Sequence, residues 1–123
     1  MRVTGKSIAL VAALSAAPAM AAEQVATTAD LLALCSVTVE DPAYPAAMGF
    51  CLGYIDAALD YHAAISAGPN NHPVTCPDDS ITREEVVQVF VQASKTSAGL
   101  PGNEAPVEGV MRAVYEKWPC SGQ

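Results

Sequence analysis

Hydrophobic residues recur at steps of three and four along most of the chain, and this spacing predicts helices. The longest such segment, from Ala46 to Ile65, contains no proline. It carries two apolar faces, one formed by Phe50, Tyr54, Ala57, Tyr61 and Ala64 and the other by Met48, Leu52, Ile55 and Leu59. Because a helix that is apolar on two sides belongs in an interior, we expect this helix at the centre of the fold.

The first two predicted helices are preceded by residues that favour a helix start. A short apolar segment at Thr28–Cys35 begins with Thr28 and Asp30, either of which can accept hydrogen bonds from the free amides of a first turn. The long segment is preceded by residues 41–45, which include two prolines, and proline fits the first turn of a helix. These residues predict that the first helix starts near Thr28 and the second just after residues 41–45.

Two further helices are expected in the second half of the chain. Thr82 and Glu85 have the spacing of a capping box, which opens a helix that we expect to run to about Ser97. Pro106 then begins a last helix, and Pro119 ends it. The sequence therefore predicts an all-α fold, a small four-helix domain.

The first 21 residues have the organisation of a secretory signal peptide. Arg2 and Lys6 are followed by an uncharged apolar run, Ser7–Ala17, and then by the small residues of Ala19–Ala21. The run is about half of the ~20 residues that cross a bilayer, which argues against a membrane anchor. We expect cleavage after residue 21, leaving one domain over residues 22–123 in the periplasm, with no membrane span.

The mature chain is expected to be strongly acidic. Removal of Arg2 and Lys6 leaves four basic residues against 13 acidic ones, a formal charge of −9. Proteins that bind nucleic acid need Lys and Arg to neutralise phosphates, so we expect no nucleic-acid partner. An anionic membrane surface is disfavoured for the same reason, whereas a basic protein partner fits.

The cysteines predict two disulfides. All of them lie in the mature chain, and they are Cys35, Cys51, Cys76 and Cys120. Four cysteines in a short exported chain are typical of two cross-links. Because Cys35 ends the first helix and Cys51 lies early in the second, while the other two flank the last two helices, pairing Cys35–Cys51 with Cys76–Cys120 gives two disulfide-linked hairpins. A pairing through Cys51–Cys76 remains open, since the intervening loop could return along roughly 20 Å of helix.

No residues carry a convincing catalytic or metal-binding pattern. Asp56 and Asp60 are one helical turn apart, but a solvated charge pair is commoner than a catalytic pair. His62 and His72 lack the spacing of a zinc site, and we interpret both as solvated. We therefore expect a protein that is not an enzyme and that needs no metal or other cofactor.

Aromatic residues and glycines of the predicted helices are interpreted as packing residues. Tyr54, Tyr61, Tyr115 and Trp118 recur at helical spacing and are expected in the core with their polar ends at its rim. Gly49 and Gly53, four residues apart, would let another backbone approach the long helix closely.

The segment from Gly68 to Val74 is the best candidate for contact with a partner. It is rich in turn-forming residues, and Asn70, Asn71 and His72 are polar and expected to be exposed. Loops held on rigid scaffolds often carry binding function, so these three residues are the predicted partner-binding residues.

The sequence resembles the Rap/Tai family, the immunity proteins of type VI secretion. The resemblance covers nearly the whole mature domain, and it rests on Leu31-Leu32 with Cys35, on residues 50–55 (FCLGYI) with Asp60, on Cys76-Pro77, on Ile81-Thr82 and on the final Pro119-Cys120. The chain departs from the family pattern at residues 99–102 (GLPG).

The resemblance implies an all-helical periplasmic domain that is often a homodimer and that binds and blocks a cell-wall amidase delivered by a neighbouring bacterium. We therefore interpret the protein as a periplasmic protein-binding module whose partner is a peptidoglycan-degrading toxin, blocked by occlusion of its active cleft. The alternatives are an acid-stress chaperone, an accessory protein of an envelope complex, and an enzyme on cell-wall material that would use Asp56 or Asp60.

Overall fold

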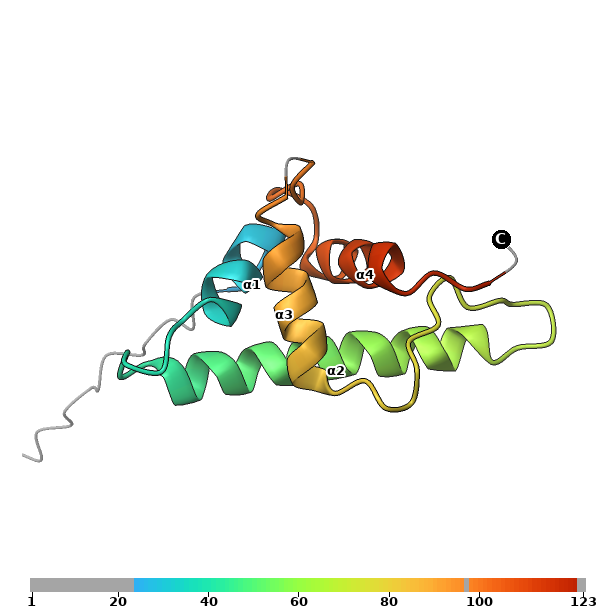
Figure 1. Ribbon diagram of the computed structural model, residues 1–123, viewed down its shortest axis with the longest axis horizontal. Coiled ribbons are helices and arrows are strands. Elements are labelled where there is room, and N and C mark those ends of the chain that lie inside the picture. The colour runs from blue at the N-terminus through green and yellow to red at the C-terminus, as the bar shows by residue number, and fades with distance from the viewer. Residues whose placement is uncertain (1–23, 97, 122–123) are drawn as a thin grey trace, which may run out of the picture.

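The computed structural model describes residues 24–96 and 98–121 (Figure 1). Within them the chain forms α1 (Thr28–Cys35), α2 (Tyr44–Ser66), α3 (Arg83–Ala93) and α4 (Pro106–Lys117). The described residues contain no strand, only an isolated antiparallel bridge between Thr75 and Pro119. The predicted all-α, four-helix domain is confirmed.

Side-chain caps determine where α1 and α3 begin. Thr27 Oγ1 accepts a hydrogen bond from the Asp30 N–H at 3.2 Å, and Asp30 Oδ2 accepts one from the Thr27 N–H at 2.9 Å. A hydrogen bond from the Thr27 hydroxyl lowers the pKa of Asp30 below its ordinary value. Thr82 and Glu85 form the predicted capping box of α3. The predicted cap of α1 was wrong for Thr28, which is buried inside the domain.

Helix α2 covers one side of the core. Helices α1, α3 and α4 lie together on the opposite side of the core (Figure 1). The core contains Leu31 and Cys35 of α1, Cys51, Ile55 and Ala58 of α2, Val86, Val87 and Phe90 of α3, and Val110, Ala113 and Val114 of α4. Only one face of α2 contributes buried residues to the core. The expectation of a central helix was wrong, because the face with Phe50 and Tyr61 is only partly covered by the described chain, and these two side chains are 47% and 65% exposed.

Two disulfides join the helices in pairs. Cys35–Cys51 links the end of α1 to α2, with 5.2 Å between the Cα atoms. Cys76–Cys120 links the segment before α3 to the segment after α4, with a Cα separation of 4.9 Å. These are the pairs that the order of the predicted helices favoured, and the described chain contains no free cysteine.

Helices α1 and α4 approach closely where Thr28 faces Gly109. Thr28 is fully buried; its N–H donates to the Glu104 carbonyl at 2.8 Å and its hydroxyl to the Ala105 carbonyl at 3.0 Å. A Cβ atom on Gly109 would lie 2.6 Å from Thr28 Oγ1 and closer still to Thr28 Cγ2. The missing side chain of Gly109 is therefore what allows this contact.

Helix α3 ends at Ala93, about one turn before the predicted end near Ser97. The hydroxyl of Ser94 donates to the Val91 carbonyl at 2.7 Å, and that of Thr96 donates to the Ala93 carbonyl at 2.9 Å. Because serine and threonine side chains satisfy the last carbonyls in this way, the helix needs no further turn.

Helices in the described part of the chain are too short or too polar to cross a bilayer. The predicted signal peptide, residues 1–21, lies outside the described residues, so it remains a prediction.

Candidate functional site

The loop between α2 and Cys76 is held to the end of α2 by side-chain hydrogen bonds. Asn71 Nδ2 donates to the Ile65 carbonyl at 2.8 Å, which satisfies one of the carbonyls left open at a helix end. A Cβ atom on Gly68 would lie 2.9 Å from Asn71 Nδ2, so glycine leaves room for this cap. The Val74 N–H donates to His62 Nε2 at 3.2 Å. The loop is thus bound back onto α2 through Asn71 in its middle and Val74 near its far end.

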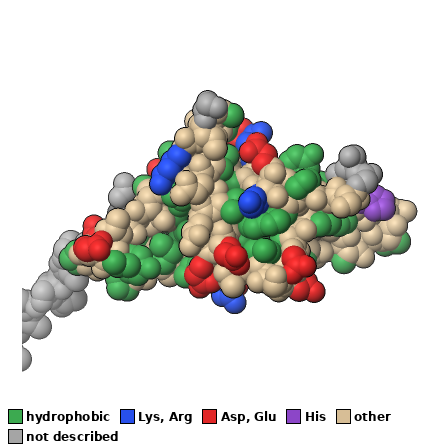
Figure 2. Space-filling model, viewed as in Figure 1, with side chains coloured by type: hydrophobic (Ala, Val, Ile, Leu, Met, Phe, Trp, Pro, Cys, Tyr) green, Lys and Arg blue, Asp and Glu red, His purple; other side chains and the backbone are tan. Residues whose placement is uncertain are grey.

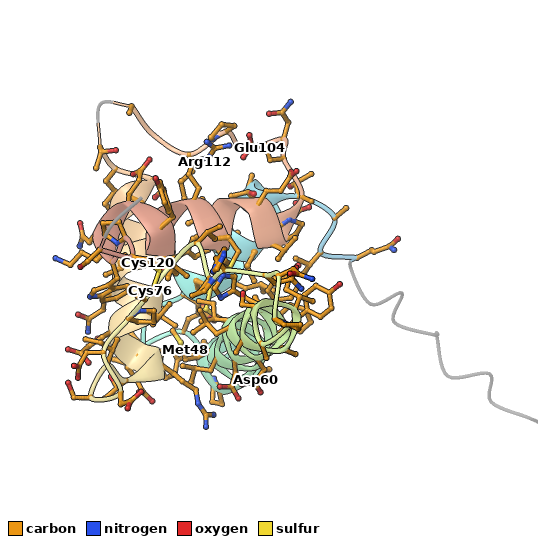
Figure 3. The ribbon with its side chains drawn as sticks, turned by 90° about the vertical axis from the view of Figure 1, so that its right-hand side faces the viewer. Met48, Asp60, Cys76, Glu104, Arg112 and Cys120 are labelled. Carbon is orange, nitrogen blue, oxygen red and sulfur yellow. A yellow bond between two sulfur atoms is a disulfide. The ribbon has the colours of Figure 1, made fainter. Side chains whose placement is uncertain are left out.

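The far end of the loop is fixed to the segment after α4. Thr75 is 3% exposed, and its hydroxyl donates to the Trp118 carbonyl at 2.9 Å. The Cys76 N–H donates to the same carbonyl, also at 2.9 Å. The disulfide between Cys76 and Cys120 lies directly beside this contact (Figure 3). A covalent bond and two hydrogen bonds therefore hold the base of the loop in place.

The anchored loop and the end of α2 enclose a hollow of about 430 Å³. Its lining combines imidazole, amide and hydroxyl groups with two exposed aliphatic side chains, and consists of His62, Ile65, Ser66, Asn70, Asn71, His72 and Val74. The three predicted partner-binding residues thus lie together around one hollow. Exposed donors and acceptors beside aliphatic surface suit contact with a protein.

His62 is the residue of this site that the sequence interpretation missed. It was expected to be solvated, but it is half-buried and accepts the Val74 N–H at Nε2. In this hydrogen bond the ring nitrogen Nε2 is the acceptor. The signal available in the sequence was the i, i+4 spacing of His62 and Ser66, whose side-chain atoms lie 3.5 Å apart.

The acidic residues of α2 have no arrangement for catalysis. Asp56 Oδ1 lies 3.0 Å from Arg83 Nε, so this carboxylate forms an ion pair with the start of α3. Asp60 points away from the other helices (Figure 3). Among the described residues, no three His, Cys, Asp or Glu side chains gather as they would around a metal ion.

A second candidate surface is the apolar stripe of α2, formed by Phe50, Tyr54, Ala57 and Tyr61. The rings of Phe50 and Tyr54 stack with their centroids 6.2 Å apart. Beside them Tyr54, Ala57, Tyr61 and Val107 of α4 line a shallow hollow of about 250 Å³. Tyr61 and Tyr115, the latter 46% exposed, were wrongly expected in the core, whereas Tyr54 and Trp118 pack against it.

Comparison with known protein families identifies a match over most of the chain. Residues 27–120 match the family model of Rap1a immunity proteins, which covers all four helices and both disulfides. No curated protein and no solved structure matches the chain. The match spans far more than half of the sequence. The chain therefore belongs to the Rap1a immunity protein family.

Proposed function

We propose that this protein is a periplasmic immunity protein that binds a peptidoglycan-degrading amidase toxin and blocks its active cleft. The observation that carries the proposal is the Rap1a family match over nearly the whole described domain, because immunity proteins act by binding a toxin. The signal-like first 21 residues support a periplasmic location. Two disulfides support it as well, since such bonds persist in oxidising compartments.

The toxin-binding element in this proposal is the loop between α2 and Cys76. Its hydrogen bonds to Ile65 and from Val74 to His62, together with the Cys76–Cys120 disulfide, hold one conformation before binding. A loop that is already ordered loses little conformational entropy when it enters a cleft. The net negative charge would add attraction to a basic cleft and raise the association rate.

Changing Asn70 and His72 to alanine together is expected to weaken toxin binding at least about tenfold, because a few central residues carry most of an interface's binding free energy. Both side chains are exposed and make no hydrogen bond within the described chain, so the variant should keep its stability. Calorimetry with an amidase toxin encoded beside this gene measures the affinity, and cell-wall hydrolysis measures the block.

The matched control is Asn103→Ala, which removes an exposed amide from the turn before α4, away from the loop. It should bind the toxin as the unchanged protein does. Equal affinity of the loop variant and the control would exclude the loop as the binding element. If neither the neighbouring amidases nor a panel of amidase toxins were bound, the immunity proposal itself would fail.

We also propose that the apolar stripe of α2 pairs with the same stripe of a second copy. The stripe contains no charge, so two strongly acidic chains could meet there without bringing carboxylates together. A Cβ atom on Gly49 or Gly53 would have nothing within 4 Å, so no part of the described chain uses the close approach that these glycines permit. These glycines lie on the helix face that carries Asp56 and Asp60, beside the stripe, so the proposed contact does not depend on them.

Changing Tyr61 to glutamate is expected to convert such a dimer into a monomer, because a charge would be buried in an apolar contact. Light scattering after gel filtration measures the molecular mass directly. Tyr115→Glu is the matched control, since Tyr115 is similarly exposed but lies on α4 outside the stripe. A monomeric unchanged protein, or a dimer that survives Tyr61→Glu, would rule out this contact.

A further inference from the structure

A groove between α3 and α4 is unrelated to either surface already described. It encloses about 470 Å³, which is within the range of small-molecule sites. Apolar side chains form its floor, and these are Val89, Ala93, Ala113 and Trp118. Polar and charged side chains form its edges, and these are Glu85, Gln88, Gln92, Thr96, Glu116 and Lys117. Figure 2 looks onto this side of the molecule and shows hydrophobic side chains between the two helices, bordered by charged ones.

Several polar groups along the groove are free to bind a ligand. Gln88 and Gln92 are one helical turn apart on α3, so their exposed amides stand side by side. Neither amide makes a hydrogen bond to another described residue, and Lys117 makes no ion pair within that part of the chain. By contrast, Glu85 and Thr96 are engaged with backbone groups at the two ends of α3.

We propose that this groove binds an N-acetylated saccharide of the kind found in cell-wall glycan. A pyranose ring has one apolar face of C–H groups and a rim of hydroxyl groups. The floor provides small alanine methyls and the indole of Trp118, whose π-face attracts the positive edge of C–H groups. The paired amides of Gln88 and Gln92 offer both donors and acceptors to neighbouring hydroxyls or to an acetamido group.

The distribution of exposed apolar side chains argues against a protein segment as the occupant. Protein interfaces are centred on large apolar and aromatic anchors. Val89 and Trp118 of this groove are both partly buried against the core, and none of the exposed large hydrophobic residues lines it, which are Val39, Phe50, Tyr61, Ile65, Val74, Val107 and Tyr115. Glu85 and Glu116 together outweigh Lys117 by one negative charge, which disfavours an anionic ligand and leaves an uncharged one acceptable.

Binding of glycan would hold the protein at the cell wall, where a peptidoglycan-degrading toxin acts. The groove shares no residue with the loop hollow that surrounds His62, so the two sites could be occupied at the same time. Saccharide binding requires no toxin and can be tested whether or not the proposed toxin partner is found.

The only tryptophan of the chain lies in this groove, so its fluorescence reports on the site. Titration of the purified protein with N-acetylglucosamine oligomers is expected to give a saturable change in Trp118 emission at micromolar to millimolar concentrations. A cell-wall stem peptide without sugar should give none. No response to the oligomers, or a response to the peptide alone, would overturn the proposal, and the second result would identify a peptide groove.

The double variant Gln88→Ala/Gln92→Ala should weaken the saccharide response at least about tenfold, since each lost hydrogen bond reduces affinity. Both side chains are exposed, so the helix should fold as before, which circular dichroism can check. Asn103→Ala removes an exposed amide outside the groove and should leave the response unchanged. Equal responses of the double variant and the unchanged protein would show that the two amides are not the binding groups.

Discussion

Replacing Gly109 by alanine is expected to lower the free energy of unfolding by about 1–3 kcal/mol, the usual cost of adding atoms to a close-packed interior. The new methyl group would collide with the Thr28 side chain, with only 2.6 Å between its carbon and Thr28 Oγ1. Thr28 cannot move aside freely, because its N–H and hydroxyl are bonded to carbonyls of residues 104 and 105. Reversible urea unfolding of the two proteins measures the difference.

The same substitution at Gly49 provides the control and should have the opposite sign. Gly49 lies on the exposed side of α2, and a Cβ atom there would meet nothing within 4 Å. Alanine at this position should stabilise the protein by about 0.5–1 kcal/mol, because glycine is the poorer helix former. A Gly109→Ala protein as stable as the Gly49→Ala protein would contradict the close contact between α1 and α4.

The starts of α3 and α4 could be predicted because their signals are local, whereas at α1 the cap is Thr27 and not the predicted Thr28. A threonine three residues before an acidic residue, or a proline in the first turn, acts within a few residues of the helix start. The end of α3 was harder to predict, because Ser94 and Thr96 can either continue a helix or bond back to its carbonyls. Local chemistry therefore fixed where this helix begins better than where it ends.

Periodicity predicted which residues of α2 share a face but not which face is covered. Both Ile55 and Tyr61 belong to regular apolar stripes, yet Ile55 is fully buried and Tyr61 is 65% exposed. Coverage depends on where the other helices pack, which the sequence of α2 does not contain. The same limit applies to Thr28 and Gly109, which are far apart in the chain and whose contact exists only in the assembled fold.

The candidate loop was found from its turn-forming residues, whereas its attachment was not. Gly68 and Asn71 are turn residues at any exposed position, and their identity alone marks the segment. The hydrogen bond from Val74 to His62 requires the chain to reverse and lie along α2, so it could not be predicted from composition. This hydrogen bond indicates that the segment is an ordered loop.

Replacing both Cys76 and Cys120 by alanine is expected to lower the free energy of unfolding by about 4 kcal/mol, because this disulfide closes the longer of the two loops. The linked residues are 44 positions apart, and losing the bond restores entropy to the unfolded chain. Cys76 is exposed, so the change leaves little cavity in the core. Urea unfolding of the oxidised protein and of the variant measures the loss.

The Cys35→Ala/Cys51→Ala variant is the comparison that separates stability from loop order. Its loop of 16 residues predicts a loss of about 3 kcal/mol, and removing two buried sulfur atoms adds a cavity cost. The two variants should therefore be of similar stability, although only the Cys76–Cys120 bond lies at the base of the candidate loop.

Amide hydrogen exchange in residues 68–75 should consequently rise in the variant that lacks Cys76–Cys120 and stay low in the one that lacks Cys35–Cys51, provided that both are measured where they are folded. Toxin affinity should follow the same order, because a loosened loop must be ordered again on binding. Equal exchange in the two variants would mean that the hydrogen bonds at Asn71, Val74 and Thr75 suffice to hold the loop. The disulfide would then act on the unfolded chain alone.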